Sequence, residues 1–123
     1  AGIGLTVANA NVTYSLTVNS LNVTTNTVTT AASGQVVLDT FPTTQLASAK
    51  YFVQANSSTV YHTTEMVLVQ DGTNAYITEY GSIQTGASLG TFSADISGGN
   101  ARLLFTAVNN INTIRAVRYG VSV

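Results

Sequence analysis

Charged residues are scarce in this sequence. Only four Lys or Arg and five Asp or Glu occur among 123 residues, or 7%, whereas a typical soluble domain is about a quarter charged. The first charge along the chain is Asp39, so residues 1–38 carry none. Nucleic-acid binding needs a cluster of basic side chains to neutralise phosphates. Four basic residues without a cluster argue against that class, and we expect no nucleic-acid partner.

Cysteine is absent and proline occurs once, at Pro42. The absence of cysteine excludes disulfides, thiolate metal sites and a Cys nucleophile. No apolar run approaches the roughly 18–20 residues that a membrane-spanning helix needs, and no basic start followed by an apolar stretch indicates a signal peptide. We therefore expect no membrane partner.

Apolar residues, in contrast, make up 45% of the chain, and the formal net charge is only −1. Near-zero net charge removes the repulsion that keeps copies of a protein apart. The composition therefore predicts a surface that associates with other protein chains, and we expect a homo-oligomer.

The hydrophobic pattern has a period of two, and Val, Thr, Ile, Tyr and Phe fill the apolar runs. This pattern and composition are typical of β-strands, and no segment shows helical spacing with caps. Short strands separated by Gly- and Asn-containing turns predict an all-β fold, a small antiparallel β-sandwich of jelly-roll type. The expected strands are Gln35–Phe41, Ala49–Ala55, Thr59–Gln70, Asn74–Ile83, Gly90–Ile96, Ala101–Val108 and Ile114–Val121.

The chain divides by composition into residues 1–33 and residues 34–123. The first part is a low-complexity mixture of Thr, Asn, Ser, Val and Leu. A strand edge without charged residues is prone to pair with another chain. We expect residues 1–33 to form an extended uncharged β arm or shaft segment whose edges another chain occupies, and residues 34–123 to form the sandwich.

The clearest local prediction is a hairpin at Asp71-Gly72, a dipeptide that suits a turn with positive φ. In the strand before it, Val60, His62, Thr64, Met66 and Leu68 share one face. Since residues 66–69 are apolar on both faces, that strand should be central in its sheet or covered on both sides. The alternative for Asp71, a calcium loop, lacks the further acidic ligands that such loops have.

Candidate catalytic residues are few. His62 is the sole histidine, and it lies within a regular strand without a nucleophile motif, which favours a packed structural role over a general base. Glu65 and Glu79 flank the Asp71-Gly72 hairpin and, if close together, would resemble the carboxylate pair of a glycosidase or a metal site. Pairing with Lys50, Arg102, Arg115 or Arg118 is the stronger interpretation.

We therefore expect no enzyme activity, no catalytic residues, no metal and no cofactor. Gly98-Gly99 is interpreted as a turn, because no helix follows to form a phosphate site. Aromatic side chains on a sandwich can also stack on sugar rings, although core or interface positions are commoner. The tyrosines available for such stacking are Tyr51, Tyr61, Tyr76, Tyr80 and Tyr119.

Residues 36–123 resemble a β domain that recurs in virion structural proteins of tailed phages, especially cyanophages and related marine phages. The residues that carry the resemblance are strand and turn segments. They are Asp39-Thr40-Phe41, Ser48-Ala49-Lys50-Tyr51, Glu65-Met66-Val67-Leu68-Val69, Asp71-Gly72-Thr73, Thr78-Glu79-Tyr80-Gly81, Leu89-Gly90-Thr91-Phe92, Ala94-Asp95-Ile96 and Arg102-Leu103-Leu104-Phe105-Thr106.

The resemblance implies a structural component of a phage virion, and residues 1–33 are similar to phage fibre shafts, which are usually homotrimeric. Two placements stay open, a tail fibre, baseplate or neck appendage and a capsid decoration (cement) protein, with the shaft-like composition slightly favouring the fibre. The expected partners are copies of this chain and other virion proteins. The alternative is a receptor- or carbohydrate-binding tip that recognises a host-surface glycan.

Overall fold

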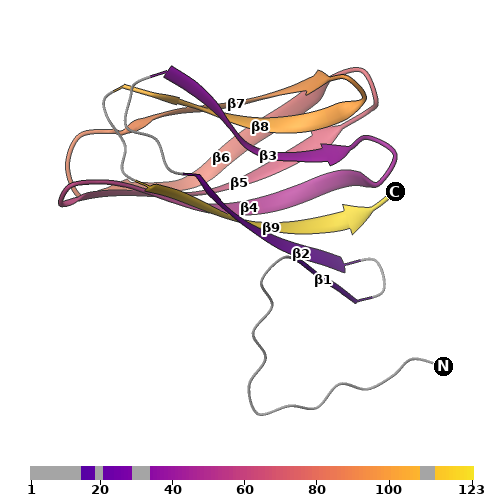
Figure 1. Cartoon of the computed structure of the whole chain (residues 1–123), viewed down its shortest axis with the longest axis horizontal. Helices are drawn as coiled ribbons and strands as arrows, with labels where there is room; N and C mark the ends of the chain where they lie inside the picture. Colours follow the sequence, from indigo (N-terminus) through magenta and orange to yellow (C-terminus); the bar gives the residue numbers. More distant parts are fainter. Residues whose placement is uncertain (1–14, 19–20, 29–33, 109–112) are drawn as a thin grey trace, which may run out of the picture.

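The computed structural model describes residues 15–18, 21–28, 34–108 and 113–123. These residues form nine β-strands and no helix, and the strands build two antiparallel sheets that face each other (Figure 1). The predicted all-β antiparallel fold is confirmed. The strands are β1 (Ser15–Val18), β2 (Leu21–Val28), β3 (Gly34–Pro42), β4 (Leu46–Ser57), β5 (Val60–Gln70), β6 (Ala75–Gln84), β7 (Gly90–Ser97), β8 (Asn100–Ala107) and β9 (Thr113–Ser122).

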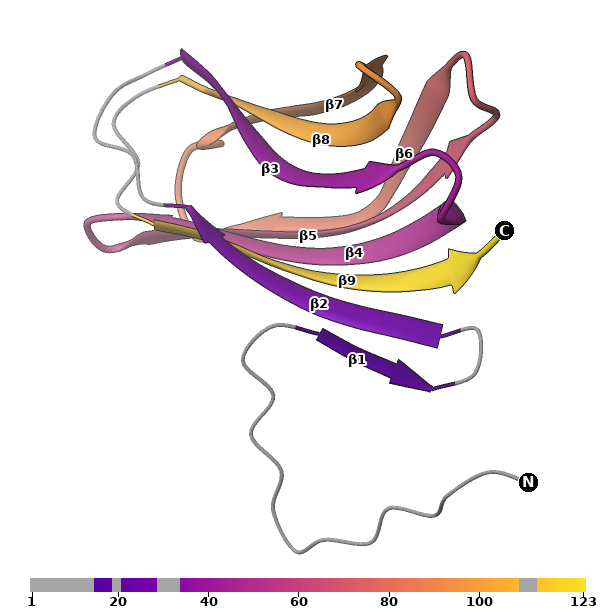
Figure 2. The ribbon, with the colours of Figure 1, turned by 45° about the vertical axis from the view of Figure 1, so that its right-hand side comes forward.

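The two sheets differ in width. Sheet A has six strands in the order β1-β2-β9-β4-β5-β6, and sheet B has three in the order β3-β8-β7. Figure 2 shows β3, β8 and β7 as one layer above the strands of sheet A. The last strand, β9, lies between β2 and β4, so the end of the described chain joins its first strands to the rest of sheet A.

All seven strands predicted between Gln35 and Val121 are present, with ends shifted by a few residues. The turns also fall where Gly, Asn and Ser interrupt the pattern, and Ser58, Gly72, Gly98 and Gly99 have positive φ there. The turn predicted at Asn109-Asn110 lies outside the described residues.

The core fills the space between the sheets with the inward-facing residues of both. Sheet A contributes side chains such as Met66, Leu68 and Ile114, which are fully buried, and sheet B contributes Leu103 and Phe105. The face predicted for Met66 is confirmed. Strand β5 is central rather than covered on both sides, because its opposite face is exposed.

Of the predicted arm, residues 1–33, the structure describes 15–18 and 21–28. Strand β2 pairs with β9 from Leu21 to Val28 and with β1 along its other edge, so both of its edges are occupied by the same chain. The expectation that another chain occupies these edges is therefore wrong for residues 21–28. Whether 1–33 and 34–123 fold as separate units stays a prediction.

The hairpin at Asp71-Gly72 forms as predicted, with Gly72 at a φ of 89°. Oδ1 of Asp71 accepts hydrogen bonds from the backbone N–H groups of Thr73 (2.9 Å) and Asn74 (2.7 Å). These backbone bonds lower the pKa of the Asp71 carboxyl. The carboxylate thus closes the turn on itself, which supports the hairpin interpretation over a calcium loop.

Candidate functional site

The face of sheet A that points away from sheet B is rich in exposed apolar and aromatic side chains. We call it the outer face. It results from strand alternation, since every inward core residue on β4, β5 and β9 is followed by one that points outward. The large exposed side chains on it are Phe52, Tyr61, Val67, Val69, Tyr76, Tyr80, Ile83, Tyr119 and Val121.

The exposed side chains of this surface lie beside one another on β9, β4, β5 and β6, where Val69 is paired with Tyr76, and the charged Lys50 and Glu65 lie among them. Lys50 on β4 is paired in register with Tyr119 on β9 and with Val67 on β5. In the next row, Phe52 is paired with Glu65. Tyr119 is 41% exposed and Phe52 is 44% exposed, so their rings present large surfaces to the outside. Large contiguous apolar patches on a soluble protein mark interaction sites.

A small polar network crosses the centre of the outer face. Lys50 Nζ lies 2.7 Å from Glu65 Oε1, and the Tyr80 hydroxyl donates to the same oxygen at 2.6 Å. The bond from Lys50 lowers the pKa of Glu65, and Glu65 in turn raises the pKa of Lys50 and of Tyr80. Glu65 thus pairs with Lys50, one of the four basic residues that the sequence offered as its partner. These groups are exposed, so the network adds little to stability and mainly fixes the positions of its side chains.

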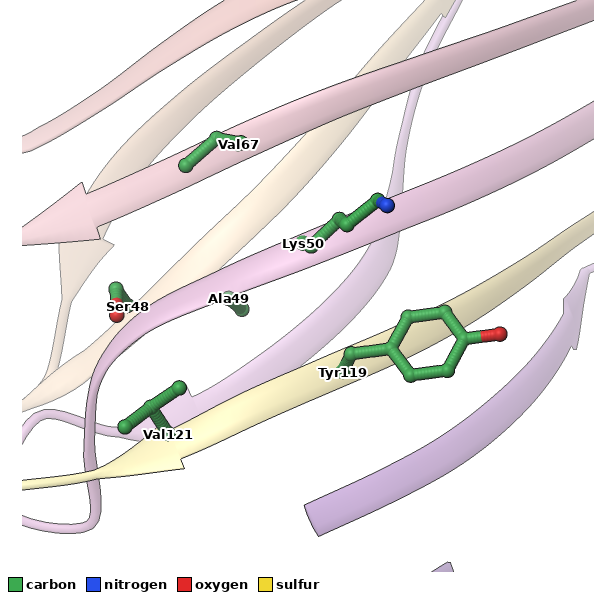
Figure 3. A pocket seen from close by; sticks show the side chains of 6 residues that line it. All are labelled: Ser48, Ala49, Lys50, Val67, Tyr119 and Val121. Atoms are coloured by element: carbon green, nitrogen blue, oxygen red, sulfur yellow. The ribbon is translucent and has the colours of Figure 1, made fainter. Parts of the chain in front are cut away.

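Two shallow hollows adjoin this network. One, of about 380 Å³, is lined by Lys50, Phe52, Glu65 and Tyr119. The other, of about 240 Å³, is lined by Ser48, Ala49, Lys50, Val67, Tyr119 and Val121 (Figure 3). Lys50 and Tyr119 border both hollows, so the two form one uneven depression around these side chains.

A buried ion pair lies behind this depression. Arg118 Nη1 donates to Asp39 Oδ2 at 2.8 Å, and the hydroxyl of Tyr51 donates to the same oxygen at 2.7 Å. Arg118 Nη2 also donates to Thr24 Oγ1 at 3.1 Å, and the guanidinium lies 5.3 Å from the centre of the Phe41 ring. The cluster links β2, β4 and β9 of sheet A to β3 of sheet B.

The location of this cluster matters for the outer face, because Tyr51 precedes Phe52 and Arg118 precedes Tyr119. Burial raises the pKa of Tyr51, and the nearby Asp39 raises it further, so the phenol stays protonated and donates. Fixing Tyr51 and Arg118 inside the sandwich holds the backbone that presents Phe52 and Tyr119 outside. Sequence reasoning named Arg118 as a partner for Glu65 or Glu79; its partner is Asp39 instead.

The tyrosines proposed for sugar stacking divide between the two faces. Tyr61, Tyr76, Tyr80 and Tyr119 are exposed on the outer face. Tyr51 has no exposed surface, so its proposed role in stacking is wrong. Strand parity explains the difference, because Tyr51 shares the inward face of β4 with Val53 and Ala55.

His62 is a packed core residue, as the sequence favoured. Its ring is 4% exposed, and Nδ1 accepts a hydrogen bond from the backbone N–H of Leu89 at 3.2 Å. Nε2 lies 3.3 Å from Ser82 Oγ, and Phe92 packs edge-on against the ring. Desolvation lowers the pKa of His62, although the nearby charge of Glu79 opposes this shift. The ring holds the segment between β6 and β7 in place.

Glu65 and Glu79 lie on opposite faces of sheet A, so they do not form a carboxylate pair. Glu79 is paired in register with the inward-facing Met66 and accepts a hydrogen bond from Thr64 Oγ1 at 2.9 Å. Arg102, another partner considered for them, forms two hydrogen bonds with Asp95 on β7, of 2.7 and 2.6 Å.

Sequence reasoning missed Phe52 as part of the exposed surface. Its position between the inward-facing Tyr51 and Val53 was a usable signal, since period two places it on the opposite face. No group of three or more His, Cys, Asp or Glu side chains suited to a metal ion occurs among the described residues. The part of the chain that the structure describes also contains no helix long and apolar enough to cross a membrane.

No protein-family model matches the sequence, and no curated protein matches it. A comparison with solved structures found phage tailspike proteins. The chain is similar to the tailspike of Acinetobacter baumannii phage AM24 (10% identity, TM-score 0.45), over 82% of this chain and 26% of the tailspike. It is also similar to tailspike gp49 of Acinetobacter baumannii phage Fri1, a capsular polysaccharide depolymerase (12% identity, TM-score 0.46), over 89% of this chain and 19% of that one.

The third is the tailspike of Acinetobacter phage vB_ApiP_P1, with 16% identity and a TM-score of 0.45 over 98% of this chain and 25% of the tailspike. The chain thus spans between 19% and 26% of the length of these proteins.

Proposed function

We propose that this chain is a structural component of a bacteriophage virion and that it acts by associating with other protein chains through the outer face of sheet A. The observation that carries the proposal is the exposed set of aromatic and aliphatic side chains there, centred on Phe52, Val67 and Tyr119. Interface cores are enriched in aromatic residues, and the outer face has this property, with Phe52, Tyr61, Tyr76, Tyr80 and Tyr119 exposed on it.

The finer parts of the proposal rest on the resemblance of residues 36–123 to virion structural proteins of the cyanophage type. They are the placement in the virion, assembly as a homotrimer, and a role without catalysis. The tail fibre, baseplate or neck placement and the capsid decoration placement both suit a sandwich that offers one broad apolar face.

Site-specific photo-crosslinking in the particle tests the proposal. A benzoylphenylalanine residue replaces Val69, which is 48% exposed on the outer face, in the chain carried by the phage that encodes it. Irradiation of purified particles should join the chain to virion proteins or to further copies of itself. The matched control places the same residue at Thr91, which is exposed on β7 of sheet B. Absence of the chain from purified particles, or equal cross-linking from both positions, would contradict the proposal.

A second candidate function is carbohydrate binding, and one observation favours it. The larger hollow places two aromatic rings, Phe52 and Tyr119, beside the ammonium of Lys50 and the carboxylate of Glu65. Rings that cover the apolar face of a sugar, together with a donor and an acceptor for its hydroxyls, are what a pyranose site requires.

Titration of the labelled chain with host-surface oligosaccharides, followed by NMR, tests this candidate. Binding should shift the resonances of Phe52 and Tyr119 and should be lost in Tyr119→Ala, whereas Tyr76→Ala, away from the hollow, should bind normally. Binding that survives Tyr119→Ala would place any sugar site elsewhere.

A further inference from the structure

We propose that the outer face of sheet A packs against the same face of a second copy of this chain, with Val67, Tyr119 and Val121 among the apolar side chains in the contact. This inference rests on the proposed function and names the partner of that surface. Contact between two identical faces joins chains in pairs, so the proposed homotrimer would form through other surfaces of the chain. The area, shape and charge of the face each support this occupant.

The face is large enough for a stable contact between copies. Strands β9, β4, β5 and β6 each contain ten or more residues. Four strands at about 4.8 Å spacing and about 3.3 Å per residue cover about 600 Å². Contact between two such faces buries about 1,200 Å² in total, above the roughly 1,000 Å² expected of a biological interface.

The shape of the face fits side chains better than a small molecule. Small-molecule pockets have volumes of about 300–1,000 Å³ and enclose most of the ligand. The apolar hollow beside Val67 and Val121 measures about 240 Å³, below this range, and the adjoining one, at about 380 Å³, lies near its lower end. Both are open depressions on the sheet and do not enclose a ligand. Exposed rings such as Tyr76 and Tyr119 rise from the same face. In a face-to-face contact, the exposed rings of each copy can therefore fill the hollows of the other, as the side chains of packed sheets interdigitate.

The charges on the face are compatible with a second copy. Among the described residues that point outward from β4, β5, β6 and β9, the charged ones are Lys50, Glu65 and Arg115. Lys50 and Glu65 neutralise each other within one copy at 2.7 Å. Arg115 then leaves each face with a single net positive charge, and the whole chain has a formal net charge of −1. Two copies therefore meet with little repulsion, and one charge over four strands is too small an excess to select an oppositely charged partner.

Sedimentation equilibrium of the purified full-length chain over a concentration series tests the inference. The unaltered chain should associate reversibly, and Val67→Glu should raise the dissociation constant about 30-fold or more, the range of an interface hot spot. Tyr119→Ser is a second variant that introduces no charge and should weaken association in the same direction. Thr91→Glu, on the exposed side of sheet B, is the matched control and should leave association unchanged.

Circular dichroism at low concentration establishes that each variant is folded. A chain that stays monomeric at every concentration overturns the inference, and so does association that neither Val67→Glu nor Tyr119→Ser weakens. A monomeric chain that still cross-links to other virion proteins through position 69 would leave the proposed function standing. Failure of the particle cross-linking alone would instead remove the proposed function and leave self-association intact.

Discussion

At the scale of single residues, the Arg118–Asp39 ion pair places two opposite charges in the interior, where their side chains are 9% and 3% exposed. Taking both charges out of water is unfavourable, and the pair persists because Tyr51 and Thr24 supply further hydrogen bonds. Removing one partner leaves the other buried without compensation. We expect Arg118→Met to lower the free energy of unfolding by about 3–5 kcal/mol, measured by urea denaturation at pH 7.

Two further variants separate the ion pair from its surroundings. Tyr51→Phe removes one hydrogen bond to the carboxylate and should lower the free energy of unfolding by about 1.5–3 kcal/mol. The double variant Arg118→Met with Asp39→Asn removes both charges, so it should be more stable than Arg118→Met alone. An additive double variant would show that the two side chains do not depend on each other.

His62 gives the molecule a second residue-scale property, a dependence of stability on pH. Its pKa in the folded protein is lowered from 6.5 by desolvation. Well above pH 6.5, His62 is neutral in both the folded and the unfolded state, so it does not reduce the free energy of unfolding. As the pH falls below 6.5, the unfolded state binds the proton first, so the folded state loses stability. The loss is at most about 1.4 kcal/mol per pH unit in this window.

Urea denaturation at pH 7.5 and at pH 5.5 measures this effect. This interval lies above the ordinary pKa values of Glu and Asp, 4.5 and 3.8, so the carboxyl groups contribute little there. His62→Asn keeps an acceptor near the N–H of Leu89 but does not titrate, and it should lose less stability between the two pH values. Equal losses in both proteins would exclude His62 as the source.

Some of these contacts could be predicted in part from the sequence. Arg118 follows Ile114 and Ala116 at a spacing of two, which places it on the inward face of its strand, and an inward Arg requires an anion. Which anion could not be predicted, because Asp39 is 79 residues away in the chain. The hydrogen bond from Leu89 to His62 could not be predicted from the sequence either. Its donor is a backbone N–H, which does not depend on the type of residue at position 89.

At the scale of elements, the strands were predictable because alternation and turn residues are local properties. Residues 34–123 show both, from the Asp71-Gly72 turn to the alternation around Met66. Pairing between distant strands is not local. Nothing in the sequence of residues 21–28 distinguishes an edge that awaits another chain from one that pairs with β9 of the same chain.

The pairing of β2 with β9 leads to a prediction about shortening the chain. A chain that starts at Gly34 lacks the eight register pairs between β2 and β9 and the bond from Arg118 to Thr24. It exposes the edge of β9 and brings solvent closer to the buried ion pair. We expect a clearly lower urea midpoint and increased aggregation, measured by circular dichroism and light scattering.

Thr24→Val in the complete chain serves as the control, because it keeps β2 and removes only the side-chain bond. It should lower the free energy of unfolding by about 1 kcal/mol, much less than the truncation. A shortened chain with unchanged stability would instead show that residues 1–33 and 34–123 are separate folding units.

At the scale of the whole molecule, the two sheets differ in what their faces contact. The three strands of sheet B cover the inner face of sheet A, and the opposite face of sheet A stays exposed. The candidate site arises from this arrangement, because Phe52 and Tyr119 come together only where β9 lies beside β4. The sequence offered five tyrosines as candidates for sugar stacking and, separately, Lys50 as one of four possible partners for Glu65. Sequence reasoning could not place them in one depression without knowing the strand order.

If copies of the chain associate through the outer face, the stability of the whole molecule should depend on its concentration. A partner that binds only the folded state stabilises it by about 1.4 kcal/mol for each tenfold increase in free partner above the dissociation constant. In a pair of identical chains the free concentration rises only as the square root of the total, so each chain gains about 0.7 kcal/mol per tenfold increase in total concentration. We therefore expect the midpoint of thermal unfolding to rise by about 2–4 °C per tenfold increase. Calorimetry from low to high micromolar concentration measures this, and Val67→Glu should abolish the dependence while Thr91→Glu keeps it. A midpoint independent of concentration in the unaltered chain would contradict association through this face.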